Sequence, residues 1–124
     1  LMASYKLPKA SDEERTRRAV AIQTHLRGAT DVPMACARAC GEVIELAARV
    51  SHIGYKGVIS DAGVGVLAAY AALRSAALNV FINAPALDDR PLADRYVAQI
   101  GELTTAGGLA SEQVYKTVRE RLES

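Results

Sequence analysis

The sequence is poor in aromatic residues and in cysteine. It contains no Trp, one Phe and five Tyr in 124 residues, and its only cysteines are Cys36 and Cys40. Two cysteines do not make a disulfide framework, so the disulfide-stapled scaffolds of secreted proteins are excluded. With so few aromatics, any core must be built from aliphatic side chains, above all alanine, and each of these buries little area.

The chain also lacks an excess of charge of either sign. Its 15 basic and 14 acidic residues give a net charge of +1. Arg15, Arg17 and Arg18 form the only basic cluster, which is typical of a solvated helix face, whereas nucleic-acid binding would need a broader basic stripe. The first residues contain no charged segment followed by an apolar one, so we expect no secretory signal. We therefore expect a cytoplasmic protein without a nucleic-acid partner.

Apolar residues recur at helical spacing along most of the chain, and no stretch shows sustained strand alternation. Ser11 followed by Glu14 is a capping-box signature for a first helix. Pro33 suits the first turn of a second helix, and Gly107 and Gly108 predict a break or bend in the last one. The predicted helices cover about 12–28, 31–52, 60 or 61 to 83, and 91–122. The sequence thus predicts one all-α domain over residues 1–124, an antiparallel helical bundle joined by short loops.

The third predicted helix is apolar on nearly every side, which is typical of a buried central helix, here one rich in alanine. Its length would also suit a membrane span. Four polar residues argue against a span, as does the lack of an aromatic belt; they are Asp61, Arg74, Asn79 and Asn83. We therefore expect no membrane partner.

Two polar residues, Ser60 and Asp61, stand at the start of this helix. Ser-Asp is also an ordinary helix start. A carboxylate at a helix N-terminus is favoured in its ionised form, which makes it a weak base but a persistent anion suited to a cationic substrate. Asn79 and Asn83 lie one turn apart on the same helix. Their amides either bond neighbouring helices or contact a polar ligand ring, and the residues alone leave both open.

The cysteines and histidines give no metal site. Cys36 and Cys40 share a helix face, but no further ligands complete a zinc site, so we expect two small buried residues. His25 is expected near the end of the first helix, where its charge would suit the helix dipole. His52 ends the second, either as a cap or as a proton carrier. We expect neither a metal nor a bound cofactor.

An ordered set of motifs resembles the cyclodeaminase/cyclohydrolase family of folate enzymes, and most closely its stand-alone cyclohydrolase branch. The segments that carry the resemblance are Tyr5–Lys9, Ser11–Glu14, Ile22–Gln23, Ala29–Pro33, Ser60–Val64, Leu73–Val80 and Ile82–Asn83. Family modules have additional N-terminal helices, so we expect this chain to be the C-terminal portion of a module. Tyr55 stands where the family commonly has an asparagine.

The resemblance implies a homodimeric enzyme of one-carbon metabolism that hydrolyses 5,10-methenyltetrahydrofolate to 10-formyltetrahydrofolate. A cyclodeaminase that releases ammonia and a non-catalytic helical or dimerisation module are the alternatives. Folate is then a substrate and not a bound cofactor. The implied catalytic residues are Asp61, which would hold the cation or orient water, and Ser60, which would support it. The implied substrate-binding residues are Asn79 and Asn83 for the pterin, and Lys9 and Lys56 for the glutamate tail.

Overall fold

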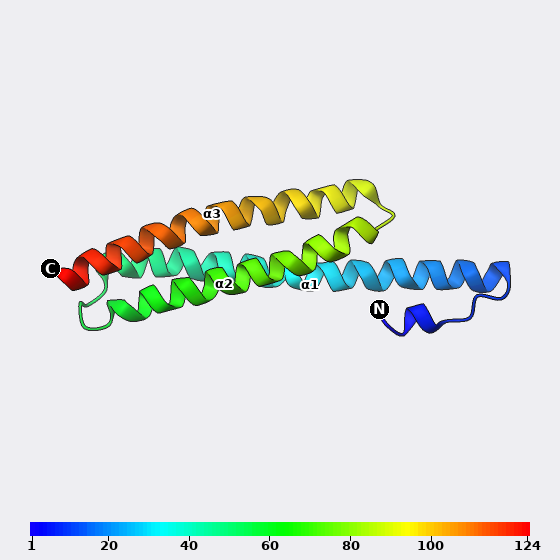
Figure 1. Ribbon diagram of the computed structural model, residues 1–124, viewed down its shortest axis with the longest axis horizontal. Helices are drawn as coiled ribbons and strands as arrows, with labels where there is room; N and C mark the ends of the chain where they lie inside the picture. Colours follow the sequence, from blue (N-terminus) through cyan, green and yellow to red (C-terminus); the bar gives the residue numbers. More distant parts are fainter.

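Three long helices make up most of the computed structural model, which describes all of residues 1–124. They are α1 (Asp12–Ile53), α2 (Ile59–Asn83) and α3 (Arg90–Glu123), and two short 3-10 turns, η1 (Ser4–Lys6) and η2 (Ala84–Ala86), accompany them. The helices run antiparallel in sequence order, and the N-terminal part of α1 extends beyond the other two (Figure 1). The structure has no strand. The prediction of an all-α antiparallel bundle is therefore confirmed.

Helix α1 is continuous where two helices were predicted. Its start is as expected, because the Ser11 side chain and Glu14 form a complete capping box. Pro33 lies inside the helix and has no N–H to donate to the carbonyl oxygen of Ala29, four residues earlier. The Asn83 side chain supplies the missing bond, with its Nδ2 donating to Ala29 O over 3.0 Å. The predicted break is therefore wrong. The sequence did not reveal the compensating bond, because this partner lies 54 residues away.

Helix α3 is also continuous, and the break predicted at Gly107 and Gly108 is wrong. A Cβ on Gly107 would lie 2.6 Å from Cδ2 of Leu73, and one on Gly108 would lie 2.8 Å from the Tyr70 hydroxyl. Both contacts are with α2. The two glycines therefore allow α3 to approach α2 closely, and they do so without ending the helix.

The core is aliphatic, as the composition predicts. Its fully buried side chains come from all three helices, and the largest are Met34, Ile44, Ile59, Leu73 and Ile100. Buried alanines fill the space between them. One aromatic residue, Tyr96, joins this core from α3.

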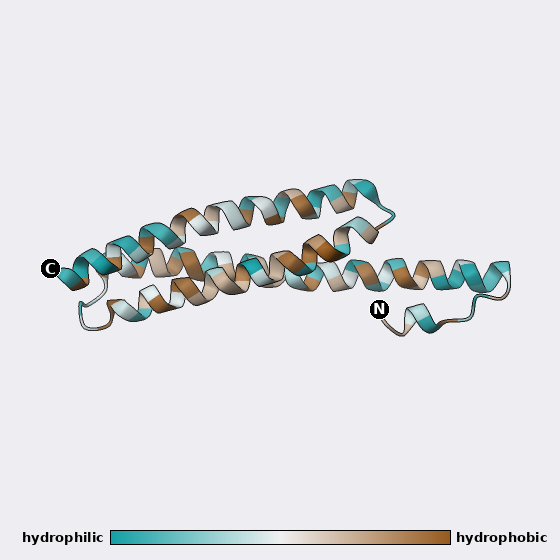
Figure 2. Ribbon diagram, viewed as in Figure 1, coloured by the Kyte–Doolittle hydropathy of each residue, from teal (hydrophilic) through white to brown (hydrophobic).

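Helix α2 is buried on one side only. Val64, Leu78 and Ile82 are exposed by 66%, 70% and 75%, and Figure 2 shows hydrophobic residues along the whole helix. Only 33% of its most apolar window is buried. The expectation of a helix buried on every side is therefore wrong within this chain. Ile59–Ala86 is also long and apolar enough to cross a membrane, although core helices of soluble proteins pass the same test.

Side-chain bonds connect other segments to the C-terminal end of α1 and to its N-terminal half. Arg121 of α3 donates to the carbonyl oxygens of Ser51 (2.7 Å) and Gly54 (2.8 Å), which lie at the C-terminal end of α1. At the other end, the N-terminal segment folds back along the helix. There the Ser4 hydroxyl lies 2.6 Å from Nδ1 of His25. His25 is therefore inside a continuous helix and not near a helix end, as was predicted.

Candidate functional site

Ser60 and Asp61 occupy the first turn of α2, as the sequence predicts. The helix begins after Val58, which provides no side-chain cap. Both side chains are exposed. Asp61 forms no ion pair, and the backbone N–H groups of this turn lie at the positive end of the helix dipole. The turn therefore presents an unpaired carboxylate to solvent, where a cationic ligand can reach it.

A small groove beside Ser60 separates α2 from α3. Its volume is about 310 Å³, and its lining residues are Ser60, Gly63, Val64, Leu67, Tyr115, Val118, Arg119, Leu122 and Glu123. Nε of Arg119 lies 2.7 Å from the Glu123 carboxylate. That bond and the negative charge raise the pKa of Arg119. The two charges on the rim of this groove thus pair with each other.

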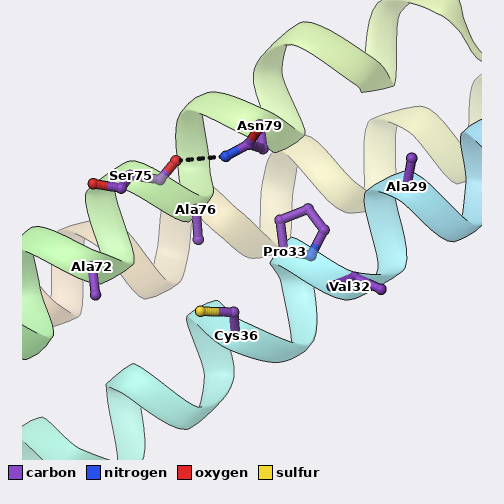
Figure 3. Close-up of a pocket in the computed structure, with 8 residues that line it drawn as sticks. All are labelled: Ala29, Val32, Pro33, Cys36, Ala72, Ser75, Ala76 and Asn79. Atoms are coloured by element: carbon purple, nitrogen blue, oxygen red, sulfur yellow. Dashed lines mark hydrogen bonds between the residues drawn. The ribbon is translucent and has the colours of Figure 1, made fainter. Parts of the chain in front are cut away.

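A larger groove, of about 680 Å³, lies between α1 and α2 (Figure 3). This size falls within the range of small-molecule sites. Its lining is Ala29, Val32, Pro33, Cys36, Ala72, Ser75, Ala76 and Asn79. The Ser75 hydroxyl donates to Ala71 O over 2.8 Å, and Nδ2 of Asn79 donates to Ser75 O over 3.1 Å. The amide oxygen of Asn79 remains available as an acceptor on an otherwise mostly apolar wall.

The two asparagines of α2 have different environments. Asn79 lines the groove. Asn83 uses its Nδ2 to bond the Ala29 carbonyl that Pro33 leaves without a donor. The sequence left open whether these amides bond helices or a ligand. The structure gives Asn83 a helix-bonding contact and places Asn79 on the groove.

The cysteines do not both lie in the core. Cys36 is exposed at the groove, so its predicted burial is wrong, and Cys40 is only partly buried. Burial raises the pKa of the Cys40 thiol, and the neighbouring Cys36 raises it further. No group of three or more His, Cys, Asp or Glu side chains is arranged to hold a metal ion.

The predicted site residues do not converge within one chain. Asn79 follows Asp61 by 18 residues on α2, which places them roughly 27 Å apart along the helix axis. Lys9 and Lys56 flank the opposite ends of α1, a helix of 42 residues that is roughly 63 Å long. His52, in the last turn of α1, lies at the same end of the bundle as Asp61 (Figure 1). One chain thus carries the carboxylate at one end of α2 and the large groove near the other.

Sequence reasoning missed a polar contact between α1 and α3. The buried Tyr96 hydroxyl donates to the Asp31 carboxylate. Burial raises the pKa of Tyr96, and the Asp31 carboxylate adds to the rise. The sequence alone assigns no contact to Asp31. Its partner could not be identified from the sequence because it lies 65 residues further along.

Comparisons with known proteins match nearly the whole chain. The formiminotransferase-cyclodeaminase family matches residues 1–102. The chain is 51% identical to a methenyltetrahydrofolate cyclohydrolase of Methylorubrum extorquens over 98% of its own length and 59% of that relative. It is 29% identical to the mouse formimidoyltransferase-cyclodeaminase over 98% of its length, which is 23% of the mouse protein. The chicken protein of the same name is 36% identical over 71% of this chain and 16% of its own. The chain therefore spans little more than half of the bacterial relative and a smaller share of the vertebrate ones.

Proposed function

The chain belongs to the formiminotransferase-cyclodeaminase family, and from that premise we propose that it forms part of an enzyme that hydrolyses 5,10-methenyltetrahydrofolate to 10-formyltetrahydrofolate. The observation that carries this proposal is the 51% identity to the bacterial cyclohydrolase over 98% of the chain. The matched region includes both Ser60–Asp61 and the lining of the α1–α2 groove, since the match covers 122 of the 124 residues.

The reaction requires three things of the protein. Water adds through its oxygen to the methenyl carbon of the cationic amidinium and loses a proton. The bond from that carbon to a ring nitrogen then breaks, this nitrogen gains a proton, and the added hydroxyl loses its remaining proton, which leaves a formyl group on the other nitrogen. The site must therefore hold the cation, orient the water and transfer protons.

Asp61 suits the first two tasks. Its carboxylate is exposed and unpaired, and it lies at the positive end of a helix dipole. A carboxylate can attract the amidinium cation and accept a hydrogen bond from the attacking water. Ser60 is adjacent on the same turn and would support that arrangement by hydrogen bonding.

The groove between α1 and α2 suits the pterin. Its apolar walls favour a flat ring, and the unbonded amide oxygen of Asn79 can accept from a ring N–H. Asn83 would act beside it by fixing α1 against α2. Lys56, in the loop before α2, is assigned to the anionic glutamate tail together with Lys9. In this proposal the enzyme is a cytoplasmic homodimer, folate is its substrate, and no separate cofactor takes part.

The test is the absorbance of the methenyl chromophore, followed with purified protein and compared with the spontaneous rate in the same buffer. We expect faster loss of the chromophore, and a rate roughly 100-fold lower for Asp61→Asn. Asp12→Asn is the matched control, because Asp12 is also an exposed aspartate in the first turn of a helix. Full turnover by Asp61→Asn would remove Asp61 from the mechanism.

A second candidate activity follows from the vertebrate relatives, whose names include a cyclodeaminase. That enzyme would close formimino-tetrahydrofolate to the methenyl compound and release ammonia. The same assay separates the two activities, because the chromophore would then appear from the formimino substrate. Absence of any change with either folate would favour a non-catalytic helical module.

A further inference from the structure

We infer that Cys36 and Cys40 form a binding site for a soft, two-coordinate metal ion of the Cu(I) class, on the α1 wall of the groove between α1 and α2. Neither thiol has a role in the proposed function. The site would hold the ion between two sulfur atoms of a single helix, with no ligand from any other element.

The two thiols lie next to each other on one face of α1. Residues four apart occupy successive turns of the same face, and helical side chains lean towards the N-terminus, which directs Cys40 towards Cys36. Burial raises the pKa of Cys40, and the charge of the Cys36 thiol and a side-chain hydrogen bond from it raise that pKa further. Two sulfurs that influence each other in this way are close enough to share one ion.

The surroundings of the pair are largely apolar. Cys36 is exposed and lines the groove, whereas Cys40 is partly buried and packs against the core. Figure 3 shows Cys36 on the α1 side of the groove, opposite Ala72 and Ala76 of α2. An ion can therefore reach the pair from solvent, and methyl groups would then shield one side of it from water.

The rest of the groove offers no ligands for a hard cation. Its lining contains no Asp, Glu or His. The side chains of Ser75 and Asn79 are its polar groups besides the thiol, and both donate to backbone carbonyl oxygens of α2. Mg²⁺ and Ca²⁺ need several oxygen ligands, and structural Zn²⁺ needs four ligands. No third His, Cys, Asp or Glu side chain joins the two thiols, so the pair suits an ion that is satisfied by two soft ligands.

The spacing favours a bound ion over a disulfide. The Cβ atoms of residues four apart on a helix are about 5–6 Å from each other, whereas a disulfide brings them to about 3.5–4.5 Å. A bond from a metal ion to a thiolate is about 2.3 Å long, so an ion held in a straight line separates the two sulfurs by about 4.6 Å. Side chains on successive turns can take that separation without moving the helix.

Binding would exchange two protons for one ion. Each thiol loses its proton to solvent, two bonds form from sulfur to the metal, and neither the sulfurs nor the ion change oxidation state. A role as a reactive nucleophile is disfavoured, because such cysteines need a nearby positive charge and the lining contains no Lys, Arg or His. Metal binding does not need that charge, since the ion itself displaces the protons.

Competition for Cu(I) tests the site without any assay of activity. The wild-type chain, reduced and free of oxygen, is titrated into Cu(I) held by a coloured chelator, and the loss of colour measures the transfer. We expect one ion per chain. Cys36→Ser and Cys40→Ser should each weaken binding by at least about 100-fold, because even residues that only support a metal ligand change affinity by 10–100-fold.

A matched control keeps two thiols and changes only their spacing. Cys36→Ser with Ala35→Cys moves one thiol by about 100° around the helix, to a position that is also exposed. It should bind Cu(I) as weakly as the single-cysteine variants. Wild-type affinity in this control would show that the shared face is not what binds the ion, and it would overturn the inference. A wild-type chain that takes no Cu(I) from the chelator would overturn it as well.

X-ray absorption by the loaded wild-type chain tests the coordination. We expect two sulfur neighbours and no nitrogen or oxygen around the ion. More than two sulfurs, or half an ion per chain, would mean that two chains share the ion, and this would overturn a site within one helix. Zn²⁺ should not displace Cu(I). Displacement at equal concentrations of the two ions would overturn the two-coordinate assignment.

Discussion

The two faces of α2 carry similar residues, but one face is buried and the other is exposed to solvent. Leu73 and Val80 on the inner face are fully buried, whereas Leu78 and Ile82, each two positions from Val80, are at least 70% exposed. Composition does not separate the two sets, since both are aliphatic. The difference lies in what covers them, because α1 and α3 cover the inner face and nothing in this chain covers the outer one. The inner face should therefore set the stability of the chain, and the outer face its assembly.

The largest expected effect comes from shortening a leucine on the inner face. Leu73→Ala should lower the free energy of unfolding by about 2–5 kcal/mol, because it removes buried methyl groups and leaves a cavity. Leu78→Ala should change it by less than about 0.5 kcal/mol. Urea unfolding at low protein concentration, where the chain is monomeric, measures both. Equal losses would mean that the two faces are equally buried in solution.

A second effect arises where α3 packs against the inner face. Gly107→Ala should destabilise the chain by about 1–3 kcal/mol, because its new Cβ would meet the fully buried Leu73. Gly101→Ala on the same helix has nothing within 4 Å of the new Cβ. That control should stabilise the chain by about 0.4–1 kcal/mol, because alanine restricts the unfolded chain. Thermal unfolding compares the two, and a shift in the same direction would argue against the close approach of α2 and α3.

The edge between the two faces gives a third prediction. Asn83→Ala should cost about 1–3 kcal/mol, because it leaves the partly buried Ala29 carbonyl without a donor. In a chain that already carries Pro33→Ala, the backbone N–H of residue 33 supplies that donor, and the loss should shrink. A double-mutant cycle measured by urea unfolding gives the coupling energy. A cycle with no coupling would show that Asn83 acts independently of Pro33.

Charges on the outer face should have a small effect on folding and a clear one on assembly. Leu78→Lys with Ile82→Lys should change the free energy of unfolding of the monomer by less than about 0.5 kcal/mol. The same change should abolish the proposed homodimer, because it places charges on the exposed apolar face of α2. Leu109→Lys, at another exposed leucine, on α3, is the control. Sedimentation at several concentrations distinguishes the variants, and a dimer that survives the double change would not use this face of α2.

The smallest predicted effect concerns an exposed and a partly buried cysteine on α1. Cys36 is exposed, whereas burial and the neighbouring Cys36 raise the pKa of the Cys40 thiol. A smaller fraction of Cys40 is then thiolate at mildly alkaline pH, so it should react more slowly with a thiol reagent than Cys36. The raised pKa also means that the folded chain keeps the Cys40 proton to a higher pH than the unfolded chain does. The protonated thiol therefore contributes stability at pH values below the usual pKa of cysteine, and this contribution declines as the pH rises through the raised pKa. Single-cysteine variants followed by mass spectrometry would reveal equal rates if both thiols were equally accessible.

Local signals predicted most of the fold. Neighbouring residues determine the capping box at Ser11, the start of α2 near Ser60 and its end at Asn83. The breaks predicted at Pro33 and at Gly107 were wrong for a shared physical reason. Each residue is compensated by a partner from α2, Asn83 in the first case and Leu73 in the second. Helix-breaking residues near the middle of a long helix cannot be interpreted without such partners.

The positions of the candidate site residues in the fold were predictable in part. Asp61 was assigned from its place at a helix start, and that place depends only on local sequence. The groove at Asn79 depends on how α1 lies against α2, which the sequence does not specify. Pro33 and Cys36 were consequently missed as lining residues. Burial of the outer face of α2 was predicted wrongly. An apolar residue indicates that its side chain is favoured in a buried environment, but it does not indicate which chain buries it.

The bond from Asn83 to Ala29 also has a consequence for the order of folding. A peptide that contains only Asp12–Ile53 would lack the donor that Pro33 removes, so its two halves should form and melt separately. In the whole chain they join when α2 docks and the loop between residues 29 and 83 closes. Closure of a loop of this length slows folding more than it weakens the folded state. The longest helix of the molecule, which looks like its most local element, should therefore be completed only in a late, long-range step.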